Sequence, residues 1–250
     1  MKAARSLQGL PSAAALLLAL FAVACADTAV APEDEEPQAT LGPQTENVGI
    51  VIAEDAIILR GHLFGAQNEV GVVLSHMRPN DQRAWFSFAQ ELADEGYAAL
   101  TFDFRGYGET GGDQDFAKLD EDLAAAVRFM RDRGKSPVFL IGASMGGTTS
   151  LVVAAEQELA GVVVISAPST FEDQDGLAAV GAVSAPKLFL ASEEDQAAVL
   201  SLEELWEAAP DPKERETYSG KAHGTDLLLG EHAEALRERI FRFLREHGGE

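Results

Sequence analysis

The chain has 250 residues, enough for one domain of ordinary to large size or two small ones, and 46% of them are hydrophobic. Charged residues make up 24%, and the formal net charge is -22. A surface this acidic repels nucleic acid phosphates and anionic lipid headgroups, which excludes both as partners bound through surface charge.

The first 25 residues have the pattern of an export signal. Lys2 and Arg5 precede an apolar run over residues 13–24, which is shorter than the roughly 20 residues of a membrane-spanning helix. The small residues at its end fit ordinary signal peptidase, with cleavage before Asp27. The run up to Cys25 also resembles a bacterial lipobox, in which the cysteine is lipidated. We favour the lipobox, which predicts an exported cell-envelope lipoprotein anchored to the membrane through Cys25; a secreted soluble protein is the alternative.

Residues 26–47 form a polar segment with an acidic run at residues 33–36. The segment has no apolar periodicity, so burial could not offset the entropy lost on ordering it. We therefore expect a disordered acidic tether, followed by one domain over residues 48–250. Because Cys25 is the only cysteine, that domain holds no internal disulfide.

From Val48 onward, short apolar runs alternate with amphipathic segments. The pattern predicts strands at residues 48–52, 56–63, 70–75, 97–102, 138–141, 162–165, 187–190 and 215–218, and helices at 81–95, 116–133, 145–159, 197–208 and 232–247. The first two strands are expected to form a hairpin at an antiparallel edge. The other strands are apolar enough to be covered on both faces. The sequence thus predicts one α/β domain, with a mostly parallel sheet of about eight strands covered by helices on both faces.

The segment Gly142-Ala143-Ser144-Met145-Gly146 has the G-x-S-x-G pattern of a nucleophile elbow. Glycines on either side let a sharp turn close, and the turn holds the serine hydroxyl near the positive end of the next helix. The pattern alone is weak in a chain with 23 glycines. It is strengthened by the strand that runs into it and the helix that follows, as the motif requires. Ser144 is therefore predicted as a nucleophile; the alternative is a glycine-rich connection with an incidental serine.

A serine nucleophile needs a base to take its proton and a third group to orient the base. Of the histidines that follow Ser144, His247 lies at the C-terminal end and His232 inside the last predicted helix. His223 lies among small residues in the loop between the last strand and that helix. Such a loop reaches the edge of the sheet where Ser144 is expected, so His223 is the predicted base.

The acid is expected after the preceding strand, where the chain reads Glu193-Glu194-Asp195. Asp195 is preferred and Glu194 is the second choice; the remaining alternatives are Glu193, Glu172 and Asp173. Asp195 also directly precedes a predicted helix, so it is equally suited to a purely structural role as the helix N-cap.

These segments together resemble the α/β-hydrolase superfamily from about Val48 to His247, and among its members the small, lidless ones similar to esterases and dienelactone hydrolases. The resemblance is carried by Leu74-Ser75-His76, Asp103-Phe104-Arg105-Gly106-Tyr107-Gly108, Gly142–Gly147, Ser192–Asp195 and Ala222-His223-Gly224. It implies the α/β-hydrolase fold and a triad of Ser144, Asp195 and His223. It also implies that the turn containing Asp103 and Arg105 is structural.

The predicted oxyanion hole departs from the family pattern. Members usually carry His-Gly after the third strand, and a backbone N–H just beyond it pairs with the N–H after the nucleophile, which is that of Met145 here. This chain has His76-Met77-Arg78-Pro79 instead. Pro79 has no N–H, so the second donor is Met77 or Arg78, and both stay open. An alternative role for Arg78 is to bind an anionic substrate through its side chain.

Only about residues 168–186 separate the sixth and seventh strands, too few for a helical cap domain, which suggests an open site for small or extended soluble esters. The expected reaction is carboxylic ester hydrolysis through an acyl-enzyme on Ser144. A thioesterase or peptidase with the same triad is an alternative, and a non-catalytic binding lipoprotein of the same fold is the rival from another class. No metal-binding or dinucleotide motif is present, so no metal and no cofactor are expected. The expected partners are a small ester-type substrate and the membrane, and no nucleic acid.

Overall fold

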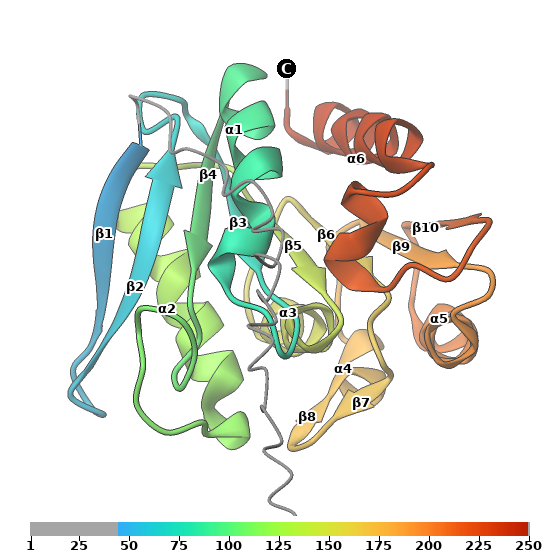
Figure 1. Cartoon of the computed structure of the whole chain (residues 1–250), viewed down its shortest axis with the longest axis horizontal. Helices are drawn as coiled ribbons and strands as arrows, with labels where there is room; N and C mark the ends of the chain where they lie inside the picture. The colour runs from blue at the N-terminus through green and yellow to red at the C-terminus, as the bar shows by residue number, and fades with distance from the viewer. Residues whose placement is uncertain (1–44, 250) are drawn as a thin grey trace, which may run out of the picture. The chain divides into compact units, whose positions relative to one another are not determined.

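The computed structural model describes residues 45–249, and these form an eight-stranded sheet with the strand order β1-β2-β4-β3-β5-β6-β9-β10 (Figure 1). The strands are β1 (Thr45–Ile52), β2 (Ile57–Phe64), β3 (Val70–Ser75), β4 (Tyr97–Phe102), β5 (Val138–Ala143), β6 (Gly161–Ile165), β9 (Lys187–Ser192) and β10 (Lys213–Tyr218). β1 and β2 form the expected antiparallel hairpin, and β2 joins β4 antiparallel. All other neighbours pair parallel, which confirms the predicted sheet.

Helices cover both faces of the sheet, as expected (Figure 1). They are α1 (Phe86–Asp94), α2 (Leu119–Asp132), α3 (Met145–Glu156), α5 (Gln196–Ala208) and α6 (Ala233–His247), with a short α4 (Gly176–Val180). The sheet therefore has a buried hydrophobic cluster on each face. One is formed with residues of α1 and α6, and the other with residues of α2, α3 and α5. In β5, Phe139 and Ile141 belong to the first cluster and Val138 and Leu140 to the second. This alternation explains why the central strands are apolar at every position.

Apart from shifts of a few residues at the ends of elements, the structure differs from the predicted elements in three places. The helices predicted at 81–95 and 116–133 begin as 3₁₀ turns, at Gln82–Trp85 and Phe116–Lys118. A small hairpin of β7 (Thr170–Phe171) and β8 (Gln174–Asp175), followed by α4, occupies the stretch between β6 and β9. Two-residue strands are too short to leave a periodic pattern, so they could not be predicted from the sequence. No large cap domain is present among residues 45–249.

The export signal, the lipidated Cys25 and most of the acidic tether lie outside the described residues, and these assignments stay predictions. β1 begins at Thr45, earlier than the strand start expected at Val48. Among the described residues, no helix has the length and apolar character needed to cross a membrane.

The turn that follows β4 is held by the buried carboxylate of Asp103. This carboxylate accepts hydrogen bonds from the backbone N–H and the side-chain amide of Gln82, both at 2.8 Å, and from the Glu109 N–H at 2.8 Å. A side chain at Gly108 would collide with the same carboxylate, and Gly108 also has a positive φ of 41°. Asp103 thus fixes the shape of the turn, in agreement with the structural role that the resemblance implies.

Arg105 and Asp122 form a buried ion pair that joins this turn to α2. Arg105 Nε donates to both carboxylate oxygens of Asp122, at 2.9 and 3.0 Å, and the Arg105 backbone N–H donates to one of them at 3.0 Å. The Asp122 side chain is 0% exposed. Burial raises the pKa of Asp122 and the hydrogen bonds from Arg105 oppose that rise, so the carboxylate depends on its partner.

Replacing Asp122 by alanine is expected to lower the free energy of unfolding by about 3–5 kcal/mol, because it leaves the Arg105 guanidinium buried without its main partner. Urea unfolding followed by circular dichroism measures the loss. Glu121→Ala is the matched control: it removes a carboxylate that is 49% exposed, pairs with Lys118 at 3.4 Å and lies 4.0 Å from Arg105 Nη2, and should cost less than about 1 kcal/mol because water screens it. Equal losses in the two variants would contradict the assignment.

Candidate functional site

Ser144 occupies a sharp turn between β5 and α3. Its backbone has φ 47° and ψ −117°, a strained conformation for a residue with a side chain, of a kind that costs on the order of 1–3 kcal/mol. Neither flanking glycine could carry a side chain. A Cβ on Gly142 would collide with the backbone of Gly146, and a Cβ on Gly146 would collide with the backbone of Ser75. The G-x-S-x-G spacing is therefore required by close backbone contacts, and one of these contacts is with the end of β3.

His223 and Asp195 are joined by a hydrogen bond of 2.6 Å between Nδ1 and Oδ2. His223 follows β10, and Asp195 follows the neighbouring strand β9. The other carboxylate oxygen of Asp195, Oδ1, accepts from the Ala198 N–H at 3.4 Å at the start of α5. The contacts expected for both roles are therefore made by one side chain: one oxygen caps the helix and the other bonds the imidazole.

The other candidate acids do not contact the imidazole. Glu193 and Glu194 are exposed. Their backbone N–H groups donate to the carbonyl of Tyr218, the last residue of β10, at 2.8 Å and to that of Gly220 in the following loop at 2.9 Å. Glu172 lies on the β7–β8 hairpin, where it pairs with Arg78.

The loop carrying His223 packs against the nucleophile elbow. Gly224 has a positive φ of 56°, and a Cβ placed there would lie 3.4 Å from the Ala143 Cβ and 2.5 Å from the Met77 Sδ. The residue after His223 therefore touches both the residue before Ser144 and the loop after β3. Ser192 strengthens this packing, since its hydroxyl donates to the Ala222 carbonyl at 2.7 Å. This role of Gly224 was not predicted from the sequence, although its position directly after a candidate base was visible there.

No hydrogen bond joins the Ser144 hydroxyl to the His223 ring within residues 45–249. Ser144 is partly exposed and the His223 side chain is 42% exposed, so both face solvent at the C-terminal edge of the sheet. Hydrogen bonds between a nucleophile and its base commonly tighten only when substrate binds. The structure thus brings the loops of the two residues together and leaves their side chains unjoined.

His76 is buried and holds the loop after β3 in place. Its Nδ1 donates to the Met77 carbonyl at 3.0 Å, and its Nε2 accepts from the Phe104 N–H at 3.2 Å. One donating and one accepting nitrogen describe a neutral ring, and burial lowers the pKa of His76, which favours the same neutral form. On the other side of the site, Met145 is the first residue of α3, so its N–H has no acceptor within the helix.

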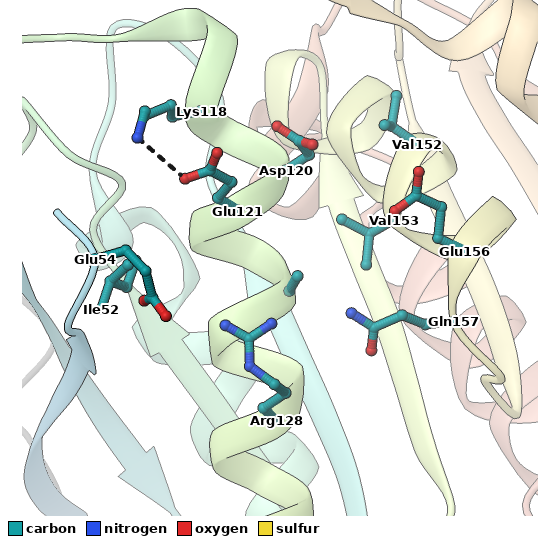
Figure 2. A pocket seen from close by; sticks show the side chains of 11 residues that line it. Ile52, Glu54, Lys118, Asp120, Glu121, Arg128, Val152, Val153, Glu156 and Gln157 are labelled. Carbon is teal, nitrogen blue, oxygen red and sulfur yellow. Dashed lines mark ion pairs between the residues drawn. The ribbon is translucent and has the colours of Figure 1, made fainter.

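Two other features of the described residues lie apart from these side chains. A groove of about 560 Å³ between α2 and α3 is lined by charged residues that include Lys118, Glu121 and Glu156, and none of the predicted site residues lines it (Figure 2). Glu214, Glu246 and His247 have potential metal-ligand atoms within 4.8 Å of one another. However, Glu214 already accepts from Arg239 Nη2 at 2.6 Å. It also lies near the start of β10, at the opposite end of that strand from His223.

Residues 67–180 match a family model described as serine aminopeptidase, S33. The match includes Ser144 and the loop after β3, and ends before Asp195 and His223. The quorum-quenching protein AidA of Acinetobacter baumannii is 30% identical over 120 residues, covering 44% of this chain and 40% of the relative. An uncharacterized protein of Escherichia coli O157:H7, YfhR, is 26% identical over 110 residues, covering 42% and 39%. The chain thus spans about two fifths of the length of the curated relatives it matches.

Solved structures resemble this chain over most of its length. An esterase of Pyrococcus furiosus has a TM-score of 0.73 at 21% identity and covers 82% of this chain and 91% of its own. A dienelactone hydrolase of Anabaena variabilis has a TM-score of 0.68 at 20% identity, covering 82% and 99%, and an esterase domain of Rhodothermus marinus has 0.67 at 24%, covering 82% and 100%. With the strand order and the elbow described above, these similarities show that the chain has the α/β-hydrolase fold.

Proposed function

We propose that the protein is a serine hydrolase that cleaves carboxylic esters through an acyl-enzyme on Ser144. The observation that carries the proposal is the 2.6 Å hydrogen bond between Asp195 and His223, in a loop that packs against a strained elbow serine. A strained serine by itself also occurs in tight turns without catalytic function, and an Asp–His pair by itself also occurs as a structural contact. The strained serine and the Asp–His pair lie at the same edge of the sheet, and this combination supports a catalytic triad.

In the proposed reaction, His223 Nε2 takes the proton of the Ser144 hydroxyl as its oxygen attacks the ester carbonyl carbon. Asp195 accepts from Nδ1, which fixes the tautomer that leaves Nε2 free and stabilises the imidazolium that forms. The imidazolium then protonates the departing alcohol as the tetrahedral intermediate collapses to the acyl-enzyme. Water, deprotonated by the same ring, releases the acid and restores the serine.

We infer that the oxyanion is held by the N–H groups of Met145 and Arg78. His76 binds the Met77 carbonyl, and the carbonyl and N–H of one trans peptide point in opposite directions. The Arg78 N–H therefore points away from the buried imidazole of His76. This geometry favours Arg78 over Met77, the two donors between which the sequence does not decide. Two backbone donors of this kind stabilise the transition state by about 3–4 kcal/mol each.

The substrates proposed are small or extended soluble esters, because the connection between β6 and β9 holds only a small hairpin and a five-residue helix. Peptide amides are the second candidate, supported by the description of the family model that matches residues 67–180. Thioesters share the same chemistry. Export and anchoring through Cys25 remain part of the proposal.

A panel of 4-nitrophenyl esters of increasing acyl length, with acyl thioesters and aminoacyl 4-nitroanilides beside it, tests this function. We expect the highest kcat/KM with short-chain esters and the lowest with the anilides, whose amine is the hardest leaving group to expel. Preferential cleavage of the anilides would reassign the protein as a peptidase. No hydrolysis of any member would favour the non-catalytic binding role.

A further inference from the structure

Arg78 carries a second group at the site, its guanidinium, which lies between the loop after β3 and the β7–β8 hairpin. Arg78 Nη1 is 3.6 Å from Glu172 Oε1, and the guanidinium carbon lies 5.4 Å from the centre of the Phe116 ring. Phe116 in turn contacts Phe171 edge to face, with ring centroids 5.6 Å apart. A cation is therefore held over an aromatic face, next to a carboxylate on the tip of a hairpin.

The hairpin that carries Glu172 is attached to its surroundings on both sides. Gln174 donates from its side-chain amide to the Phe116 carbonyl at 2.9 Å, and Thr148 of α3 donates to the Pro168 carbonyl at 2.7 Å. Glu172 itself has a positive φ of 47° in the tight turn between the two strands. The carboxylate is thus placed beside Arg78 by a braced turn.

The Arg78–Glu172 pair is weak enough to be exchanged. The two side chains are 48% and 50% exposed and make a single contact beyond hydrogen-bond distance, so water screens their attraction. By contrast, the guanidinium keeps a full set of planar donors that bind a carboxylate in two parallel hydrogen bonds. A substrate carboxylate that binds in this way replaces Glu172 at little cost.

Tyr107 connects the surroundings of Arg78 with the residue that follows the elbow serine. Tyr107 donates from its hydroxyl to the Met145 sulfur at 3.7 Å, and Met145 directly follows Ser144. The charge of Arg78 acts on Tyr107, where it lowers the pKa of the phenol against the stronger effect of burial. Since the Arg78 N–H is also the inferred oxyanion donor, its side chain begins beside the ester carbonyl.

We propose that the Arg78 guanidinium binds a carboxylate of the substrate, so that the enzyme prefers esters of dicarboxylic or hydroxycarboxylic acids, and that Glu172 is the resting partner displaced by it. This inference rests on the proposed ester hydrolysis at Ser144. The net charge of the protein is -22, which repels anionic substrates in general. Arg78 would provide the local positive charge that an anionic substrate needs in order to bind.

The test compares two matched pairs of chromogenic esters. One pair is 4-nitrophenyl hydrogen adipate and 4-nitrophenyl hexanoate, with the charge on the acyl side; the other is 5-acetoxy-2-nitrobenzoate and 4-nitrophenyl acetate, with the charge on the leaving side. The readout is the ratio of kcat/KM for the anionic and the neutral member, corrected for spontaneous hydrolysis. A ratio removes any general effect of a variant on the oxyanion loop.

Arg78→Gln is expected to lower this ratio about tenfold in at least one pair, as for the loss of a charge-assisted hydrogen bond. Glu172→Gln should raise the ratio of that pair two- to fivefold, because the guanidinium loses its resting partner. Arg215→Gln is the matched control: Arg215 is also exposed, lies over the Trp206 ring at 4.8 Å and pairs with Glu203 at 2.6 Å, but on the early part of β10. It should leave both ratios unchanged.

Equal ratios for wild type and Arg78→Gln in both pairs, or an equal fall in Arg215→Gln, would overturn the inference while leaving ester hydrolysis intact. Failure of the proposed function looks different, since wild type would then cleave neither neutral ester. Titration calorimetry with adipate tests the carboxylate site independently of ester hydrolysis, because it measures binding alone. Binding to wild type that is lost in Arg78→Gln supports the carboxylate site without any turnover, and equal heats in the two proteins count against it.

Discussion

Ser144→Ala is expected to lower kcat for the best 4-nitrophenyl ester by about six orders of magnitude, the loss that follows removal of a triad nucleophile. Without the hydroxyl no acyl-enzyme forms. The residual rate comes from direct attack of water on the bound ester, with the oxyanion donors stabilising the transition state. The fold should be unaffected, because alanine fits the same turn and the Ser144 N–H keeps its 2.9 Å bond to the Ile165 carbonyl. Steady-state kinetics measure the loss of kcat, and thermal unfolding measures whether the stability is unchanged.

Labelling with a fluorophosphonate probe gives the control for this variant. Wild type should take one label, and Ser144→Ala none. Ser169→Ala replaces a half-buried serine in the segment after β6 and is expected to label like wild type. Undiminished labelling of Ser144→Ala would move the nucleophile elsewhere, and an unlabelled wild type would remove the support for an acyl-enzyme.

The second large effect is expected from Asp195→Asn, which should lower kcat about 10⁴-fold with little change in stability. Asparagine caps a helix as well as aspartate does, so the bond to the Ala198 N–H is kept. However, an amide placed against His223 Nδ1 favours the wrong tautomer and gives no stabilisation of the imidazolium. Activity and the free energy of unfolding should therefore respond separately, which distinguishes the catalytic from the capping role.

Two neighbouring variants complete the test. Asp195→Ala loses both roles and should combine the loss of activity with a destabilisation of about 1 kcal/mol from the missing cap. Glu194→Gln changes an exposed side chain that does not contact the imidazole and should stay within a few fold of wild type. A greater loss in Glu194→Gln than in Asp195→Asn would reassign the acid.

Much of the fold could be predicted because its elements are long and regular. The buried strands have continuous apolar runs, and β3 and β4 begin and end at the residues expected. In the helices, apolar residues recur at helical spacing, as at Leu119, Leu123 and Val127 in α2, and all three are buried. Ser144 could be singled out because the elbow needs glycines at fixed positions, and a fixed local spacing is visible in sequence.

The rest depends on contacts between distant segments. Glu193, Glu194 and Asp195 are adjacent in sequence, and only the path of the loop shows which side chain bonds His223. The choice between Met77 and Arg78 depends on where a carbonyl points, and this is set by the ring of His76 and its bond to Phe104. The Arg78–Glu172 contact requires a hairpin too short to be recognised. Such features have no periodicity and no motif.

The two bonds of Asp195 have a consequence for how the proposed acid could be replaced during evolution. Aspartate has the short side chain that caps a helix, whereas glutamate is a poor N-cap because its carboxylate stands one carbon farther out. A change to glutamate at 195 would have to be accompanied by a new first turn of α5, and a move of the acid to position 194 would leave that turn uncapped. The identity and place of the acid are therefore inherited together with the start of a helix, which makes this position harder to exchange than its exposed neighbours.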